Sequence, residues 1–171
     1  MNIIIIGHPG SGKTYVADHL SKMTNTLKID IDVLFDKHPF YLFYKKSYNK
    51  ALAKLLEDNH SWVIDGYHVG MMPDELFIKA DYIIFLNLPK DELKQNVLAR
   101  YKLKKANKEF SHWQSMYLNN LKNFGQIRFQ DYAIKNDVAR VKNLATITAA
   151  YTELRSKDEI NLFISNFHTT P

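Results

Sequence analysis

NIIIIGHPGSGKT, residues 2–14, joins four consecutive isoleucines to the spacing G-x-x-x-x-G-K-T. The isoleucine run predicts a short buried strand, and the apolar spacing of Val16, Leu20 and Met23 predicts a helix directly after it. Glycines between such a strand and helix let consecutive backbone amides converge on one anion, at the positive end of the helix dipole. This stretch therefore predicts a strand, a phosphate loop (residues 7–14) and a helix.

Within the phosphate loop, individual residues have expected partners on a nucleotide. The ammonium of Lys13 would lie between the β- and γ-phosphates, and the hydroxyl of Thr14 would bind Mg²⁺. We expect ATP, with GTP as an alternative, and Mg²⁺ as its metal. The expected contacts with the nucleotide come from Gly7, His8, Pro9, Gly10, Ser11, Gly12, Lys13, Thr14 and Tyr15.

Length and composition favour a single globular domain. The 171 residues suit a single domain, 1–171, and 46% of them are hydrophobic. The opening apolar run is too short for a signal peptide or a membrane span, so we expect a cytoplasmic protein without a membrane partner. We expect the protein to be a monomer or a homodimer. The chain has no cysteine, which excludes disulfides and thiolate metal sites.

Strand and helix patterns alternate along the chain, as a doubly wound parallel sheet requires. After the first strand, further strands are predicted at residues 27–31, 61–66, 82–86 and 146–154. Helices are predicted after Pro89, over residues 113–124, and after a capping box that runs from Ser156 to Glu159. The pattern predicts an α/β fold with five parallel strands.

Three aspartates follow the predicted strands that lie near the phosphate loop. Because parallel strands end at one edge of a sheet, Asp30, Asp32 and Asp65 should gather beside the bound phosphates. We expect Asp65 to hold Mg²⁺ through water, opposite Thr14, with Asp30 near the metal. Asp32 would accept a proton from, or orient, an acceptor hydroxyl. The alternative is that these carboxylates only cap turns.

Phosphoryl transfer also needs positive charge on the transferred group, which arginine usually supplies. The chain has four arginines, none before position 100, and Arg100 is the first candidate while Arg128 is the second. Five of the nine residues from 100 to 108 are basic, in a chain of net charge +5. This segment favours a lid over phosphates; a nucleic-acid patch and a solvated helix face are the alternatives.

Several motifs resemble the P-loop nucleoside and nucleotide kinases of adenylate-kinase type, especially the bacterial DNA topology modulation proteins. The resemblance rests on the loop at residues 6–14, on DVLF at 32–35, on WVIDGY at 62–67 and on FLNLP at 85–89. It implies a three-layer fold with strand order 2-3-1-4-5 and helices on both faces. It also implies an acceptor-binding helical segment at about 33–60, a helical lid at about 101–142, and adenine held by the loop at Arg155 and Ser156.

Departures from that family bear on the substrate. Adenylate kinases carry D-G-F-P-R where this chain has DGYHV at 65–69, and no arginine occurs between Asp32 and His60. A bidentate clamp on an acceptor monophosphate is therefore missing from this segment. We expect ATP-dependent phosphoryl transfer to a small hydroxylated acceptor, with Lys13, Asp32 and Arg100 as catalytic residues. The alternative is a nucleotide-regulated nucleic-acid-binding protein, or a kinase of polynucleotide ends, that uses the basic segment at 100–108.

Overall fold

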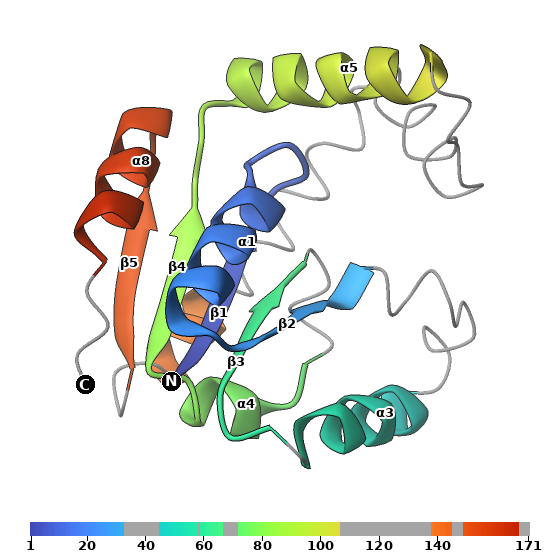
Figure 1. Ribbon diagram of the computed structural model, residues 1–171, viewed down its shortest axis with the longest axis vertical. Coiled ribbons are helices and arrows are strands. Elements are labelled where there is room, and N and C mark those ends of the chain that lie inside the picture. The colour runs from blue at the N-terminus through green and yellow to red at the C-terminus, as the bar shows by residue number, and fades with distance from the viewer. Residues whose placement is uncertain (33–44, 58, 67–71, 107–137, 145–148, 168–171) are drawn as a thin grey trace.

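The computed structural model describes residues 1–32, 45–57, 59–66, 72–106, 138–144 and 149–167 (Figure 1). In chain order, the elements are β1 (Asn2–Gly7), α1 (Lys13–Thr24), β2 (Leu27–Asp30), α3 (Lys45–Glu57), β3 (Trp62–Asp65), α4 (Asp74–Ile78), β4 (Tyr82–Leu86), α5 (Lys90–Ala106), β5 (Ala150–Leu154) and α8 (Lys157–Asn166). Residues 138–144 are also helical.

The five strands form one parallel sheet in the order β2-β3-β1-β4-β5. This order confirms the predicted α/β fold and places β1 in the middle. Ile3, Ile4 and Ile5 are completely buried, which a central strand requires because both of its faces are covered. The carboxyl ends of the strands share the edge at which the phosphate loop begins (Figure 1).

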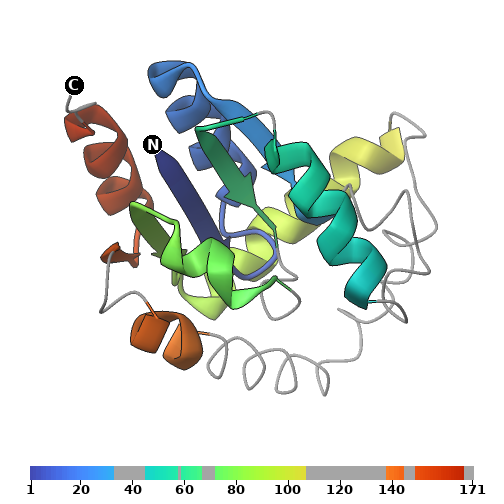
Figure 2. The same cartoon turned by 90° about the horizontal axis from the view of Figure 1, so that it is seen from below.

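Helices cover both faces of the sheet and so complete three layers. On one face, Ile3 and Ile5 pack with buried residues of α1, α8 and the first turn of α5. On the other face, Ile4 and Ile6 pack in a cluster with α3, α4 and the helical residues 138–144. Figures 1 and 2 show α1 and α8 on one side of the sheet and α4 on the other, with α5 crossing the carboxyl edge.

Some predicted boundaries differ from the structure. β2 ends at Asp30, and the next two residues are helical rather than part of the strand. β5 begins at Ala150, and residues 146–148 of the predicted strand lie outside the described residues. The short helix α4 was not predicted, because five residues are too few to show a helical period. Met23 was expected to face the core but is 44% exposed, in the last turn of α1 before the chain turns through Asn25.

Other predictions fall where the structure gives no description. The helix expected over 113–124 lies there, as do most of the lid expected at 101–142 and the first part of the acceptor segment at 33–44. Within the described ranges, none of the helices has both the length and the apolar character needed to cross a bilayer.

Candidate functional site

The phosphate loop connects β1 to α1 in a conformation that depends on its glycines. Gly10 and Gly12 have φ angles of 82° and 91°, which L side chains rarely adopt. A Cβ atom on Gly7 would lie 2.7 Å from the Ser11 hydroxyl oxygen and 2.8 Å from the backbone oxygen of Leu86. The N-cap residue of α1 is Gly12, which has no side chain to cap the first amides of the helix, so the loop and the helix terminus together can bind an anion.

Lys13 lies at the start of α1 and is only 7% exposed. Its Nζ atom donates a hydrogen bond to the His8 backbone oxygen at 3.0 Å, which holds the ammonium over the loop. Burial lowers the pKa of Lys13, while the carboxylates of Asp32, Asp65 and Asp30 oppose that change. The charge of Arg100 also lowers the pKa of Lys13. The structure thus brings the predicted carboxylates and the first candidate arginine around one ammonium group.

Strand register explains why two of the carboxylates meet α1. Asp65 pairs with Ile5 on β1 and with Asp30 on β2, and paired residues of a sheet point to the same face. Ile5 packs against α1, so Asp65 and Asp30 lie on the side of the sheet that carries the phosphate loop. Thr14 Oγ1 donates a hydrogen bond to Asp65 Oδ2 at 3.0 Å.

The Asp65 carboxyl group is in an unusual environment for an acid. It is 1% exposed, and its Oδ1 atom is buried with no hydrogen-bond partner among the residues that the structure describes. Burial, followed by the negative charge of Asp30, raises the pKa of Asp65 to about 6, against the opposing effects of Thr14, Lys28 and Lys13. A buried oxygen without a partner, beside a threonine hydroxyl, fits a hard divalent cation such as Mg²⁺.

The described residues do not supply a full set of metal ligands from protein side chains alone. No group of three or more histidine, aspartate or glutamate side chains there is arranged to hold an ion. Mg²⁺ typically binds one or two protein oxygens and takes its other ligands from waters and substrate phosphates. The pair of Thr14 and Asp65 matches that mode of binding.

Asp30 is the last residue of β2, and Asp32 lies in the helical turn that follows it. The backbone N–H of Asp32 donates a hydrogen bond to Asp30 Oδ1 at 2.9 Å. Asp30 therefore does cap this turn, which was the alternative to a role near the metal. Gly66 packs closely on the turn, because an added Cβ atom would lie 2.1 Å from Ile31 and 3.1 Å from Asp32 Oδ1. This contact holds Asp32 next to the end of β3, beside Asp65.

Tyr15, which was expected to contact the nucleotide, lies in the first turn of α1. Arg155 and Ser156, which the family resemblance places near adenine, lie directly before α8. Tyr15 is 51% exposed and its ring lies 4.2 Å from that of His19, centroid to centroid. Ser156 Oγ accepts a hydrogen bond from the Glu159 backbone N–H at 3.1 Å, so the predicted N-cap is confirmed. The Glu159 carboxylate bonds the backbone N–H of Arg155 at 2.6 Å, one residue earlier than in a standard capping box.

The remaining predicted residues have simple placements. His8, Pro9 and Gly10 are half-buried in the loop, Ser11 is buried and Gly12 is exposed. Arg100 and Arg155 are exposed, and Arg155 Nε donates a hydrogen bond to Glu153 Oε1 at 3.0 Å. Arg128 lies outside the described residues.

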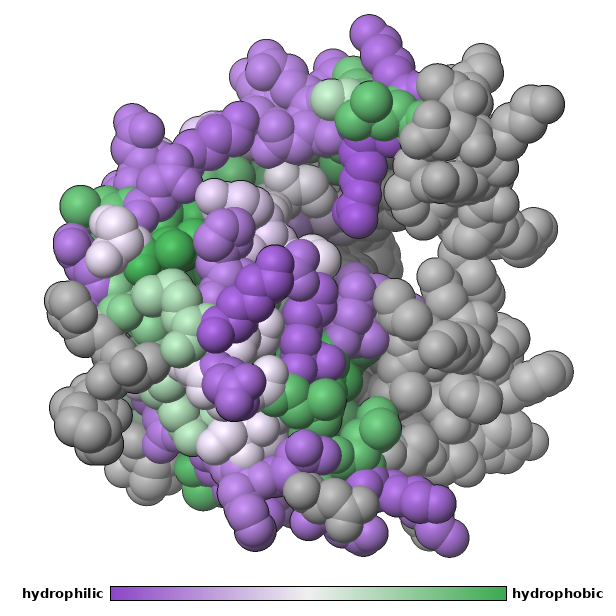
Figure 3. Space-filling view, in the orientation of Figure 1, coloured by the Kyte–Doolittle hydropathy of each residue, from purple (hydrophilic) through white to green (hydrophobic). Residues whose placement is uncertain are grey.

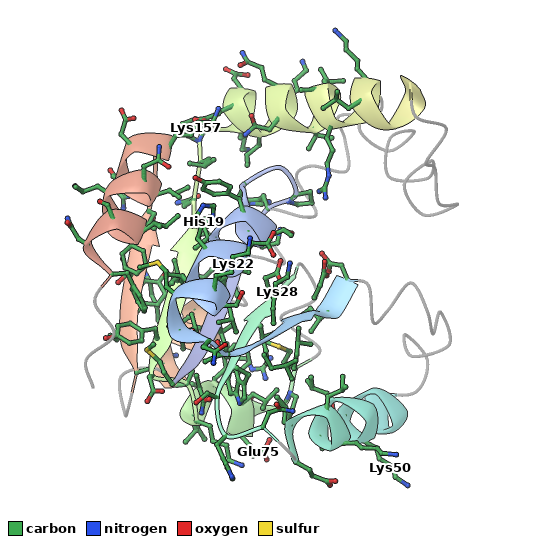
Figure 4. The ribbon with its side chains drawn as sticks, in the orientation of Figure 1. His19, Lys22, Lys28, Lys50, Glu75 and Lys157 are labelled. Atoms are coloured by element: carbon green, nitrogen blue, oxygen red, sulfur yellow. The ribbon has the colours of Figure 1, made fainter. Side chains whose placement is uncertain are left out.

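Two residues near the site were missed by the sequence reasoning. Lys28 lies on β2 and its side chain meets α1 (Figure 4), where its Nζ atom is 2.5 Å from Asp18 Oδ1. Its charge also acts on Asp65. Its position two residues before Asp30 on a strand was the available signal, because such residues share a face. Asn96 on α5 donates a hydrogen bond from Nδ2 to the Gly10 backbone oxygen at 2.9 Å. The sequence feature that could have indicated Asn96 was its spacing of four residues, one helical turn, from Arg100.

Solved structures similar to this chain have the same fold. A shikimate kinase from Acinetobacter baumannii in complex with shikimate matches with a TM-score of 0.57 and 14% identity, over 96% of this chain and 88% of that one. A shikimate kinase from Bacteroides thetaiotaomicron matches with a TM-score of 0.55 and 16% identity, over 96% and 94%. An uncharacterized protein from Eubacterium ventriosum gives a TM-score of 0.53 and 17% identity, over 98% and 99%.

Curated proteins give no significant match to the sequence. The protein family described as AAA domain matches residues 3–116, a range that contains the phosphate loop and all three predicted carboxylates. Because that range is more than half of the 171 residues, the chain belongs to the AAA domain family, and its fold is that of the P-loop kinases.

Proposed function

We propose that this protein is a Mg²⁺-dependent kinase that transfers the γ-phosphoryl group of ATP to a hydroxyl group of a small acceptor. The observation that carries the proposal is the surroundings of Lys13. Its buried ammonium lies on the phosphate loop, near the carboxylates of Asp32, Asp65 and Asp30 and near the guanidinium of Arg100. Phosphoryl transfer depends on this combination of positive charge on the phosphates and oxygen ligands for a metal.

Each group then has a distinct task. Lys13 and the loop amides hold the β- and γ-phosphates, and Thr14 with Asp65 holds Mg²⁺, which neutralises the charge that develops on the phosphates. Asp32 accepts the proton of the attacking hydroxyl or orients it. Arg100 stabilises the charge on the transferred group from α5.

The acceptor is a small hydroxylated molecule, and a nucleoside is the first class to test. The absence of arginine between Asp32 and His60 supports this choice, because a monophosphate acceptor is normally clamped by a bidentate guanidinium. Membership in the topology modulation group stays a prediction. Since two of the similar folds are shikimate kinases, one of them bound to shikimate, shikimate belongs in the acceptor screen.

The test is ADP formation from Mg·ATP in the presence of nucleosides, nucleotides, sugars and shikimate. With an acceptor identified, Lys13→Ala and Asp32→Asn should each lower the rate at least about a hundredfold, since each removes a group that acts on the reacting atoms. Lys22→Ala removes an exposed ammonium from the last turn of the same helix (Figure 4) and should turn over normally. Normal turnover by Asp32→Asn would refute its proposed role.

A further inference from the structure

One face of α5 lies directly on the phosphate loop. A Cβ atom on Gly10 would come within 2.7 Å of the Leu93 backbone oxygen and 2.8 Å of Val97 Cγ2, so only glycine allows the two segments to approach this closely. Leu93 and Val97 are buried, and Asn96 between them is half-buried. The outer surface of α5 is largely hydrophilic (Figure 3), as expected for a helix that contacts the protein along one side only.

Asn96 makes the specific polar bond in this contact. Its Nδ2 atom donates to the Gly10 backbone oxygen at 2.9 Å. Its Oδ1 atom accepts from Lys157 Nζ at 3.5 Å, and the same Nζ atom lies 3.2 Å from Glu92 Oε1. Figure 4 shows Lys157 where the start of α8 meets the start of α5. A single amide group thus connects the phosphate loop, α5 and the first residue of α8.

Arg100 lies on the same stripe of α5, one helical turn after Asn96. Residues at positions i and i+4 of a helix share a face, so the bond at Asn96 fixes the direction in which Arg100 leaves the helix. A slip of α5 by one residue would move Arg100 by about 1.5 Å and rotate it by about 100°. Misplacements of about 1 Å are enough to impair phosphoryl transfer, because the reacting groups must be aligned.

We propose that Asn96 is a positioning residue: its bond to the Gly10 carbonyl sets α5 on the phosphate loop so that Arg100 reaches the phosphates held by Lys13. The inference rests on the proposed function, since it assigns Arg100 to bound phosphates. The charge of Arg100 lowers the pKa of Lys13, as expected when two cations lie within electrostatic range of each other. Asn96 contributes no charge of its own, and the proposal assigns its effect on the nucleotide to the placement of Arg100 rather than to the Gly10 carbonyl itself.

The test is a double-mutant cycle measured by calorimetric titration with Mg·ATP. Asn96→Ala and Arg100→Ala should each weaken binding about tenfold, the size expected for losing one charge-assisted contact. The double variant should bind about as weakly as either single variant, because both changes remove the same contact. Gln95→Ala, an exposed neighbour on the same helix, provides the matched control and should bind like wild type.

The outcomes separate the inference from the proposed function. If wild-type protein binds no Mg·ATP, the proposed function is wrong and the inference falls with it. If wild type binds but Asn96→Ala binds equally well, or if the two losses multiply to about a hundredfold, Asn96 does not act through Arg100. Urea unfolding of every variant shows whether it is folded, and Asn96→Ser, which is too short to reach Gly10, replaces the alanine variant if that one unfolds.

Discussion

Asp65→Asn should stabilise the ligand-free protein and at the same time abolish Mg²⁺-dependent phosphoryl transfer. In the folded protein, burial and the charge of Asp30 raise the pKa of Asp65 from 3.8 to about 6. At about 1.4 kcal/mol per pH unit, this rise corresponds to about 3 kcal/mol of the free energy of unfolding. Asparagine is nearly isosteric and carries no charge, so it avoids this cost but is a poor ligand for Mg²⁺.

The sign of the pH dependence follows from which state holds the proton. Between pH 3.8 and about 6, the folded protein keeps a proton on Asp65 that the unfolded chain has released. The free energy of unfolding therefore falls as pH rises through that window. Above it, Asp65 is ionised in both states and the protein carries the full loss of about 3 kcal/mol. Asp65→Asn should match wild type near pH 4 and exceed it by up to about 3 kcal/mol above pH 6.

Urea unfolding followed by circular dichroism, at a series of pH values from about 4 to 8, measures this difference directly. Asp158→Asn, which removes an exposed carboxylate from the first turn of α8, is the control and should keep the pH slope of wild type. The reasoning is refuted if Asp65→Asn is less stable than wild type above pH 6, or if the two proteins differ by the same amount at every pH.

Three further changes probe the site and its supports. Gly10→Ala should lower the free energy of unfolding, measured in urea, more than Gly12→Ala does. Both variants place a side chain at a positive φ, which costs about 1–2 kcal/mol, but only at Gly10 would the new Cβ atom clash with α5. Equal losses would contradict the tight packing of the loop on that helix. Lys28→Met removes a positive charge that favours the ionised form of Asp65, so it should raise the pKa of Asp65 further. Because the same charge repels a cation, the variant should also bind Mg²⁺ a few-fold more tightly above that pKa, and an unchanged Mg²⁺ titration would contradict the effect of Lys28 on the site. Ser156→Ala should lower the free energy of unfolding by about 1 kcal/mol through loss of the α8 N-cap, and an unaltered urea midpoint would show that the cap contributes nothing.

Local signals in the sequence were sufficient for much of the fold. The isoleucine run, the glycine-rich loop and the N-cap at Ser156 each depend on neighbouring residues, and each is found where it was predicted. The misses have local causes as well. α4 is too short to show a period, and β2 gives way to a helical turn at Ile31, where the apolar pattern of the strand continues unchanged.

Some residues of the candidate site could be predicted from local sequence motifs, and others could not. Lys13, Thr14 and Asp65 were predicted as site residues from motifs, because a phosphate loop and a strand-end carboxylate are each recognisable within a few residues of sequence. Asn96 and Lys28 belong to no motif. Their places in the candidate site come from partners far along the chain, the Gly10 carbonyl for Asn96 and the Asp65 carboxylate for Lys28.

By itself, the sequence determined the chemistry of the loop, the alternation of strands and helices, and the aspartates available to a metal, since these follow from residue type and spacing. Only the tertiary structure decided how those groups meet. Parallel pairing placed Asp30 beside Asp65 on the face of α1, and the docking of α5 on Gly10 brought Arg100 near Lys13. The physical reason is that burial and charge interactions depend on distances through space, which the folded sheet and its helices fix and which spacing along the chain does not.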